Sequence, residues 1–192
     1  MSENEENSVC SAQDVAQMLK RIAFEITDRN AASDKLVLVG VLTRGVSLAQ
    51  RLQNIISAAS GRELPLGILD ITLYRDDLSI ATHHPVVRKT EIPFSLDGAT
   101  VILIDDVLYT GRTVRAAMDS LIDFGRPQSI QLAVLVDRGC HELPIAADFV
   151  GVSVPASPQD RVMVRVAEND GFDKVTVMPR DSMPQDSTSG EE

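Results

Sequence analysis

The sequence has few cysteines, no long apolar run and no cysteine–histidine spacing typical of a zinc site. Cys10 and Cys140 are too few for a disulfide framework, so both are expected to be reduced thiols. The chain also lacks the ~20 consecutive apolar residues that a membrane-spanning helix needs. Because Met1–Cys10 is polar and acidic rather than apolar like a signal peptide, a cytoplasmic location is expected.

Nucleotide-hydrolase motifs are missing as well. The P-loop pattern G-x-x-x-x-G-K-S/T occurs nowhere in the chain, so a nucleotide hydrolase of that class is a poor match. The three histidines, His83, His84 and His141, stand in loop-like sequence. They are expected to be exposed imidazoles that bind no metal.

The net charge of −10 comes mainly from the two ends of the chain. Acidic residues are frequent in Met1–Ser8 and Asp181–Glu192, and neither stretch holds a lysine or arginine. The residues between them are therefore close to charge balance. Bulk charge does not point to a nucleic-acid binder, which is typically strongly basic.

Residues 9–178 are predicted to form one domain, between disordered tails at residues 1–8 and 179–192. The length of 192 residues and a hydrophobic content of 44% suffice for one core. The tails are rich in polar and acidic residues, and the second also holds Ser, Pro and Gly, so they cannot bury enough apolar surface to become ordered.

The hydrophobic pattern predicts an α/β fold with a parallel sheet. Ser11 and Asp14 stand at the spacing of a capping box before the first helix. Alternating strands and helices imply right-handed crossovers, so ligands are expected in the loops after Val41, Ile104 and Val136, at the carboxyl ends of strands. Helices are expected at Ser11–Arg29, Gly45–Ala59 and Arg112–Phe124. Strands are expected at Lys35–Val41, Leu64–Leu73, Val101–Ile104, Ile130–Val136, Phe149–Val154 and Arg161–Val166.

The stretch Val101–Thr113 carries the most informative pattern. Four apolar residues are followed at once by Asp105 and Asp106, and then by a Thr-Gly-Arg-Thr turn that opens a helix. Amides at a helix N-terminus attract an anion, and Gly111 lets the backbone approach it closely. The two acids suit the hydroxyls of a ribose and positive charge that develops on its ring. The alternative, in which the acids only cap a turn, explains less of this pattern.

This stretch resembles the phosphoribosyl pyrophosphate (PRPP) motif of type I phosphoribosyltransferases. Over residues 9–177 the chain resembles the PyrR family of bifunctional pyrimidine-operon attenuators and uracil phosphoribosyltransferases. The resemblance rests on four stretches, Gly40–Gly45, Asp70–Leu78, Asp105–Arg115 and Gly125–Gly139. It implies the type I phosphoribosyltransferase fold, which is a mostly parallel central sheet flanked by helices with a small hood, and a homo-oligomer, either a dimer or a tetramer.

The resemblance also assigns the residues that bind PRPP. The loop after the first strand would hold the pyrophosphate, and Arg44 offers a planar fork of donors to phosphate oxygens. Asp105, Asp106 and Arg44 are the expected catalytic residues. The expected PRPP-binding residues are Thr43, Arg44, Gly45, Asp105, Asp106, Val107, Leu108, Tyr109, Thr110, Gly111, Arg112 and Thr113.

Two further segments are implied to close the site. Residues 74–90 correspond to a flexible lid, from which Arg75 is expected to reach phosphate; the alternative is a solvated charged loop. Asp137, Arg138 and Gly139 begin the hood that covers uracil. Mg²⁺ is expected to bind through PRPP rather than in a protein cage, with Asp137 helping through water.

The implied reaction converts uracil and PRPP into UMP and pyrophosphate, in pyrimidine salvage and in regulation of pyrimidine biosynthesis genes. The ribosyl carbon would pass through an oxocarbenium-like state. Uracil would be read by backbone groups of residues 138–143. No general base is assigned, because Tyr109 stands where purine-specific relatives carry an acid.

The alternative function is that of a UMP-responsive, RNA-binding transcriptional attenuator with weak or no catalysis. Lys20, Arg21 and Arg29 keep part of the basic face that binds RNA in the family. A third hypothesis is a nucleotide sensor that acts on a protein partner with little catalysis or RNA affinity.

Several cations of that basic face are replaced in this chain. Phe24 stands where the family usually has histidine, His141 and Ala146 where it has arginine, and Val152 where it has lysine. Each lost cation removes a phosphate contact and its counterion release. The PRPP motif carries no such changes, so catalysis is favoured over attenuation.

Overall fold

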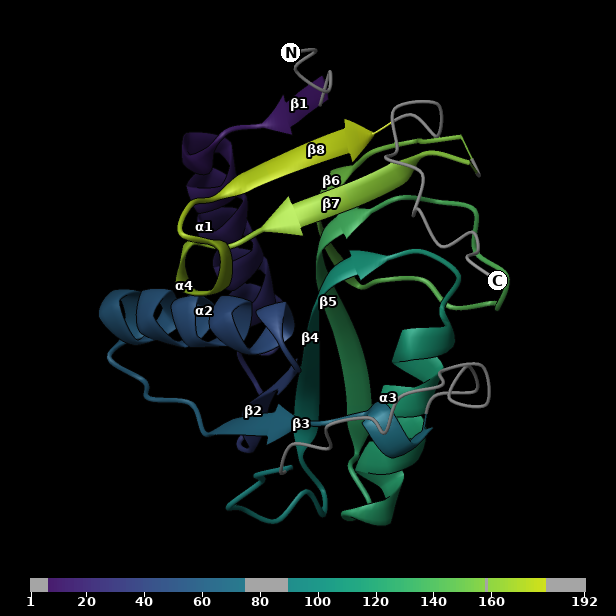
Figure 1. Cartoon of the computed structure of the whole chain (residues 1–192). Helices are drawn as coiled ribbons and strands as arrows, with labels where there is room; N and C mark the ends of the chain where they lie inside the picture. Colours follow the sequence, from purple (N-terminus) through teal and green to yellow (C-terminus); the bar gives the residue numbers. More distant parts are fainter. Residues whose placement is uncertain (1–6, 75–89, 158, 179–192) are drawn as a thin grey trace.

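The structure, a computed structural model, describes residues 7–74, 90–157 and 159–178. Its centre is a five-stranded parallel sheet with the strand order β3-β2-β4-β5-β6 (Figure 1). Every residue of β2 is buried, as expected for a parallel sheet that is covered on both faces. The strands are β2 (Leu36–Val41), β3 (Leu66–Leu69), β4 (Thr100–Leu108), β5 (Ser129–Asp137) and β6 (Phe149–Ser153).

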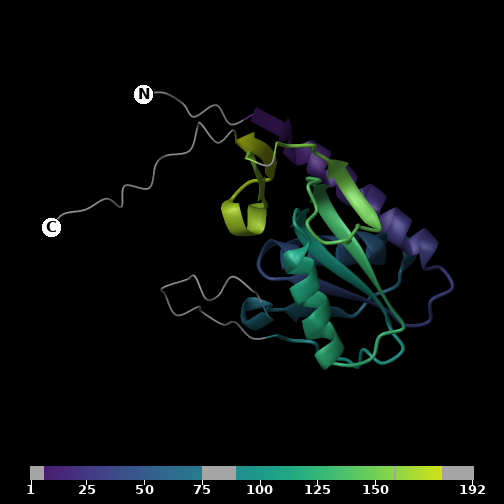
Figure 2. The ribbon, with the colours of Figure 1, turned by 90° about the vertical axis from the view of Figure 1, so that its right-hand side faces the viewer.

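Helices cover both faces of this sheet. The core on the α1 and α2 side includes Leu38 and Ile102, and the core on the α3 side includes Val39 and Leu103. Neighbouring strand residues thus alternate between the two cores, and Figure 2 shows α1 and α3 on opposite sides of the sheet. No helix within the described ranges is long and apolar enough to cross a membrane. The helices are α1 (Ala12–Arg29), α2 (Arg44–Ser60) and α3 (Arg112–Asp123).

The capping box predicted before the first helix is confirmed. The Asp14 amide donates to Ser11 Oγ at 3.3 Å, and the Ser11 amide donates to Asp14 Oδ2 at 2.8 Å. These bonds satisfy backbone donors that an uncapped first turn leaves without a helical partner. The bounds of all three predicted helices are confirmed to within one residue.

A second, antiparallel sheet joins the two ends of the described chain. β1 (Asn7–Cys10) pairs with β8 (Lys174–Met178), and β8 pairs with β7 (Arg161–Arg165). Sequence analysis predicts neither β1 nor β8, and it assigns Asn7 and Ser8 to a disordered tail. The correction has a physical cause, because β1 is polar and mostly exposed, and its order comes from the ladder to β8 rather than from burial.

Two predicted strands have different ends in the structure. The strand predicted at Leu64–Leu73 is shortened to β3, because the Asp70 side chain accepts the Thr72 amide and turns the chain into a 3-10 helix at Thr72–Tyr74. The strand predicted to end at Ile104 instead continues to Leu108, because β5 keeps pairing with it that far. The acid pair therefore lies within β4 rather than after it.

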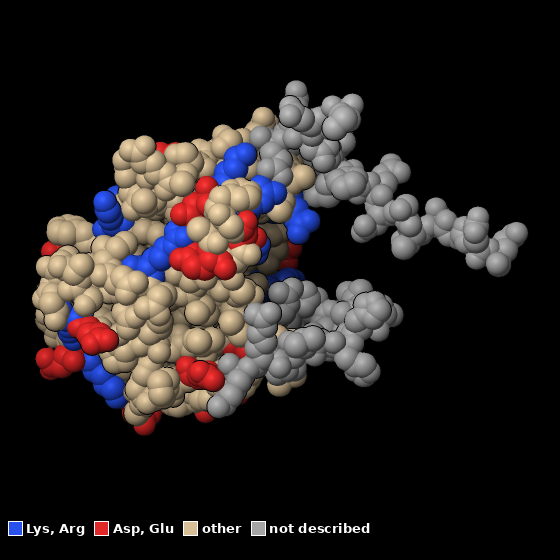
Figure 3. Space-filling model, turned by 60° about the vertical axis from the view of Figure 1, so that its left-hand side comes forward, with Lys and Arg blue, Asp and Glu red and all other residues tan. Residues whose placement is uncertain are grey.

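The surface of the described chain carries both signs of charge. Figure 3 shows Lys and Arg side chains interleaved with Asp and Glu side chains over the face that it presents. This mixture agrees with the near balance of charge that the sequence predicts between its acidic ends. A basic stripe of the kind that tracks a nucleic-acid backbone is not seen on that face.

The capping box gives a first prediction. Ser11→Ala removes the hydroxyl that accepts the Asp14 amide and donates to the Asp14 carboxylate, and it is expected to lower the free energy of unfolding by about 1 kcal/mol. Urea denaturation followed by circular dichroism measures the change. Gln13→Ala, at an exposed position in the same turn, is the matched control and is expected to change stability little; equal effects of the two variants would contradict a role for the cap.

Candidate functional site

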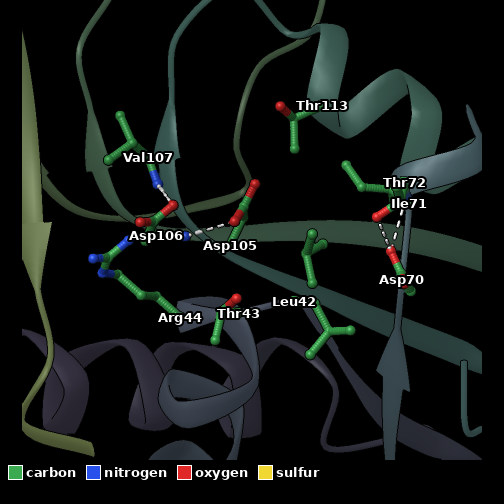
Figure 4. A pocket seen from close by; sticks show the side chains of 11 residues that line it. Leu42, Thr43, Arg44, Asp70, Ile71, Thr72, Asp105, Asp106, Val107 and Thr113 are labelled. Atoms are coloured by element: carbon green, nitrogen blue, oxygen red, sulfur yellow. Dashed lines mark hydrogen bonds between the residues drawn. The ribbon is translucent and has the colours of Figure 1, made fainter. Parts of the chain in front are cut away.

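A cavity of about 480 Å³ opens where β2, β3 and β4 end, which is the sheet edge that the sequence predicts. Figure 4 shows the acid pair on one side of this cavity and the residues that follow β3 on the opposite side. It thus gathers residues from three loops that are far apart in the sequence. The lining residues are Val41, Leu42, Thr43, Arg44, Asp70, Ile71, Thr72, Asp105, Asp106, Val107 and Thr113.

The acid pair lies near the carboxyl end of β4, with both residues lining the cavity. The Asp106 amide donates to Asp105 Oδ1 at 2.9 Å, and the Val107 amide donates to Asp106 Oδ1 at 2.8 Å. Asp105 is only 6% exposed. Each carboxylate is therefore held by the next amide along the chain, beside the cavity (Figure 4).

Burial of this pair has an electrostatic consequence. It raises the pKa of Asp106 above the usual range, although hydrogen bonds from Asp105 and the Val107 amide, together with the charge of Arg44, act in the opposite direction. A carboxylate whose charge is disfavoured by burial gains from any positive charge placed near it. The cavity is therefore suited to a cation or to a reacting group that becomes positive.

The N-terminus of α3 forms another wall of the cavity through Thr113. Gly111 precedes the helix with φ 89°, in the left-handed region that glycine adopts readily. A Cβ at this position would lie 3.3 Å from the Leu143 side chain and 3.4 Å from that of Ile145, so space as well as conformation favours glycine. A helix N-terminus presents amides and a positive dipole end, which suit a phosphate group.

The loop between β2 and α2 forms the wall on the other side of the acid pair. The peptide bond between Leu42 and Thr43 is cis, and α2 begins at Arg44. A Cβ on Gly45 would lie 2.5 Å from the carbonyl oxygen of Ile104. Glycine is therefore required for the first turn of α2 to lie directly against β4, next to Asp105.

Arg44 lines the cavity, but its side chain also has a partner within the protein. Its Nε donates to Asp170 Oδ2 at 2.9 Å, and its Nη2 donates to Asp170 Oδ1 at 2.7 Å. These hydrogen bonds hold the pKa of Asp170 at about 2, well below the usual range. The guanidinium predicted to meet phosphate is thus held by a carboxylate at the edge of the cavity.

Sequence reasoning missed the lining residues that follow β3. Asp70 lies beside the cavity, and its Oδ1 accepts hydrogen bonds from the amide and the hydroxyl of Thr72. Asp70 directly follows the apolar strand β3, as Asp105 directly follows an apolar run, so the same pattern was present in the sequence. Asp170 gave no comparable signal, because it lies in a short polar segment far from every motif.

The predicted hood residues lie next to the site but do not line the cavity. Asp137 Oδ1 accepts the Gly139 amide at 2.8 Å and lies 2.9 Å from His141 Nε2. Arg138 is 5% exposed, stacks 3.7 Å over the ring of Tyr109 and donates from Nη2 to the carbonyl oxygen of Ser157. Arg75, predicted in the lid, lies outside the described residues.

The remaining residues predicted to bind PRPP connect the α3 turn to the hood. The carbonyl oxygen of Thr110 accepts the amides of Glu142 at 3.0 Å and Leu143 at 3.1 Å, and Arg112 Nε donates to Glu142 Oε2 at 2.9 Å. Leu108 is buried in the core, with its carbonyl oxygen accepting the amide of Arg138. None of these three predicted residues is among those that line the cavity.

The acid pair also fits the metal ion that the sequence implies. Mg²⁺ in phosphate-binding sites typically takes one or two carboxylates and completes its shell with substrate phosphates and water. Asp105 and Asp106 supply two carboxylates at the cavity. Across the described residues, no three or more His, Cys, Asp or Glu side chains form a metal cage. The donor set therefore suits an ion that binds together with a phosphorylated substrate.

Comparison with known families and proteins agrees with this geometry. The model of the phosphoribosyl transferase domain matches residues 7–166. The Bifunctional protein PyrR of Pelotomaculum thermopropionicum is 54% identical to this chain, over 91% of this chain and 96% of that protein. The protein of the same name from Thermus thermophilus is 54% identical, over 89% of this chain and 94% of that protein.

Solved structures agree with the fold. A hypoxanthine phosphoribosyltransferase of Trypanosoma cruzi superposes with a TM-score of 0.70 at 19% identity, over 93% of this chain and 99% of that chain. A hypoxanthine phosphoribosyltransferase from Staphylococcus aureus gives a TM-score of 0.68 at 19% identity, over 92% of this chain and 94% of that chain. At this identity the likeness concerns the fold alone, and it confirms the type I phosphoribosyltransferase fold predicted from the sequence.

The close contact at Gly45 gives a second prediction. Gly45→Ala places a methyl group against the backbone of β4, so the first turn of α2 must move, and the free energy of unfolding is expected to fall by about 1–3 kcal/mol. Urea denaturation measures this loss. Asn54→Ala, at an exposed position in the middle of α2, is expected to change stability by less than about 0.5 kcal/mol. An unchanged unfolding midpoint for Gly45→Ala would show that this contact is not tight.

Proposed function

The chain belongs to the phosphoribosyltransferase family and, within it, to the PyrR proteins, and from this premise we propose that it is a uracil phosphoribosyltransferase of pyrimidine salvage. The observation that carries the proposal is the pair of Asp105 and Asp106 beside a cavity of about 480 Å³. The N-terminus of α3, which suits a phosphate group, flanks the pair on one side, and the loop that begins α2 flanks it on the other.

Each part of PRPP has a matching wall in this cavity. The 5′-phosphate is assigned to the N-terminus of α3, where Thr113 adds a hydroxyl and the helix dipole favours the anion. The ribose is assigned to the acid pair, whose carboxylates accept hydrogen bonds from its hydroxyls. The pyrophosphate is assigned to the loop from Leu42 to Arg44, where a guanidinium offers N–H donors to phosphate oxygens.

The chemistry follows from the charge of these walls. The bond from the anomeric carbon to the pyrophosphate oxygen breaks, with its electrons leaving on pyrophosphate, while N1 of uracil forms a bond to that carbon and loses its proton to solvent. Asp105 and Asp106 stabilise the positive charge on the ribose in the transition state. Mg²⁺, when bound with PRPP, supplies charge that offsets the departing pyrophosphate.

Uracil is assigned to the hood side of the acid pair. The Glu142 and Leu143 amides are bonded to the carbonyl oxygen of Thr110, which fixes this part of the hood against the turn that binds phosphate. Arg138 is buried against Tyr109. This packing supports recognition of uracil by backbone groups of the hood. In this proposal the Arg138 side chain packs behind those groups and does not extend into the cavity.

The surface supports catalysis over RNA attenuation. Arg21 donates to Glu25 Oε1 at 2.8 Å and to carbonyl oxygens of β6, and Arg29 pairs with Asp148 at 3.0 Å. Two of the cations that remain on the expected RNA face are thus engaged within the protein. Phe24, on the same helix, is 72% exposed and offers no charge to a phosphate backbone.

The family also supports two broader proposals. The proposed substrates, PRPP and uracil, are small metabolites of the cell interior, so we propose that the enzyme acts in the cytoplasm. We further propose that it is a homo-oligomer, either a dimer or a tetramer, as the resemblance implies. Gel filtration with light scattering measures the mass directly, and a mass of 20.8 kDa, that of one chain, would contradict an oligomer.

The acid pair gives the third prediction. The native protein with Mg²⁺, PRPP and uracil is expected to form UMP, and Asp106→Asn is expected to lower kcat by about 100-fold or more, because a charge that stabilises the transition state is lost. UMP formation is followed by chromatography.

The same variant separates chemistry from stability. Because burial raises the pKa of Asp106, the ionised carboxylate is disfavoured in the folded state at neutral pH. Asp106→Asn removes that charge, so its melting temperature is expected to equal or exceed that of the native protein. Asp119→Asn, the same change on the exposed face of α3, is the control and is expected to keep full activity. A native protein that binds PRPP but forms no UMP would overturn the proposed reaction.

RNA binding gives the fourth prediction. In a gel shift at physiological salt, the native protein is expected to bind pyrimidine-operon leader RNA no more tightly than a scrambled RNA, with a micromolar or weaker dissociation constant. The double change Phe24→His and Val152→Lys, which restores the residue types usual in the family, is expected to strengthen binding. Leader-specific binding by the native protein that UMP enhances would instead favour the attenuator.

A further inference from the structure

The pyrophosphate loop is tied to a distant part of the chain by one forked ion pair. Arg44, at the start of α2, donates from Nε and Nη2 to the two carboxylate oxygens of Asp170, 126 residues further along. Asp170 ends α4 (Ala167–Asp170), the short turn between β7 and β8. Two parallel N–H to oxygen bonds fix both the position and the plane of a guanidinium.

Asp170 is itself firmly held. Its Oδ2 also accepts the Val166 amide at 2.8 Å, and its own amide donates to the carbonyl oxygen of Val166 at 2.7 Å. One turn into α2, Ser47 Oγ donates to Asn169 Oδ1 at 2.8 Å. The position of the Asp170 carboxylate is therefore fixed by its own turn. It remains ionised at neutral pH, because its pKa is about 2.

A second ionic contact joins the same two elements away from the cavity. Arg51, two turns along α2, forks to Glu168 with bonds of 2.8 and 2.6 Å and to Asp173 with two bonds of 2.8 Å. Figure 3 shows acidic and basic side chains interleaved on the side of the molecule that carries α2 and α4. The contact between the α4 turn and α2 therefore does not depend on Asp170 alone. Of the two arginines, Arg44 lines the cavity and Arg51 does not.

We propose that Asp170 is a positioning residue for PRPP, which it serves by holding Arg44 in the orientation that meets the pyrophosphate; the proposal rests on the function proposed above. The fork uses two of the five N–H donors of the guanidinium and leaves three for an anion in the cavity. Figure 4 shows the Arg44 side chain extending toward Asp106, beside the acid pair. Asp170 does not line the cavity, so it acts through Arg44 and not on the substrate.

Two opposing effects decide the sign of this influence. The negative charge of Asp170 weakens the attraction between Arg44 and pyrophosphate, but the pair is partly exposed, so water screens much of that repulsion. Without Asp170, the long arginine side chain would have to lose its rotamer freedom each time PRPP binds, and for arginine this entropy cost is high. The entropy cost outweighs the screened repulsion, so Asp170 strengthens the binding of PRPP on balance.

Asp170→Asn tests the proposal, because an asparagine side chain has one acceptor oxygen instead of two and cannot form the parallel fork. With the full chain and Mg²⁺, the KM for PRPP and the dissociation constant for pyrophosphate by calorimetry are both expected to rise about five- to tenfold. The KM for uracil is expected to stay the same. Asp170→Glu, which keeps the carboxylate, is expected to recover part of the loss.

Two controls on the same turn separate positioning from simple loosening of the structure. Glu168→Gln breaks the comparable fork to Arg51. Asp173→Asn removes the charge and one of the two acceptor oxygens that hold Arg51 and the Ala167 amide. Both variants are expected to bind PRPP as the native protein does. If either variant weakens the binding of PRPP as much as Asp170→Asn does, the cause is loss of the contact between α4 and α2, and the proposal is wrong.

The outcomes also distinguish this proposal from the proposed function. Asp170→Asn that binds PRPP and pyrophosphate as tightly as the native protein, or more tightly, overturns the positioning role even if the native protein forms UMP. Absence of UMP formation by the native protein overturns the proposed function, while calorimetry with pyrophosphate still tests Asp170. Loss of affinity for uracil along with PRPP would show general damage to the site and would also count against the proposal.

Discussion

The site depends on two neighbouring carboxylates that a buried central strand carries into a cavity. Most of β4 is buried between helices on both faces, and its charged residues stand near its end. There Asp105 and Asp106 each accept a hydrogen bond from the next amide along the chain, and Arg44 lies close by. Burial nevertheless disfavours the charge of Asp106. A reacting group that becomes positive offsets the cost of this buried negative charge. The desolvation that destabilises the folded state therefore strengthens the attraction between Asp106 and the transition state.

Backbone packing determines how near the other groups come to that pair. Gly45 lets the first turn of α2 lie against the carbonyl oxygen of Ile104, and Gly111 lets the turn before α3 lie against Leu143 and Ile145. Two helix N-termini are thereby brought to one edge of the sheet, on either side of the acids. Because both close contacts involve the backbone of a glycine, substitutions on the exposed surface, such as those on the RNA face, can leave this geometry intact.

The sequence predicted the parts of the molecule whose cause is local. Apolar runs predicted the buried strands, the spacing of Ser11 and Asp14 predicted a cap, and the strand ends at Val41 and Ile104 predicted the edge of the sheet where a cavity opens. It failed where order comes from distant partners. β1 is a polar strand that exists because β8 pairs with it, and β4 is longer than its apolar run because β5 continues beside it. The contact between Arg44 and Asp170 spans 126 residues and has no sequence signal at all.

The two functions associated with the family place different demands on the chain, and this chain meets them unequally. Catalysis needs a cavity built from strand ends and glycine turns, all of which are in place. RNA binding needs cations that are free to meet phosphates, whereas Arg21 and Arg29, although about half exposed, are each paired with an acceptor of this chain. These acceptors lie on β6, on the β5–β6 connection and within α1. The C-terminal sheet, by contrast, remains connected to the cavity, because the α4 turn between β7 and β8 holds Arg44. If Asp170 positions Arg44 as proposed, the antiparallel sheet formed by β1, β8 and β7 contributes to substrate binding as well as to the fold.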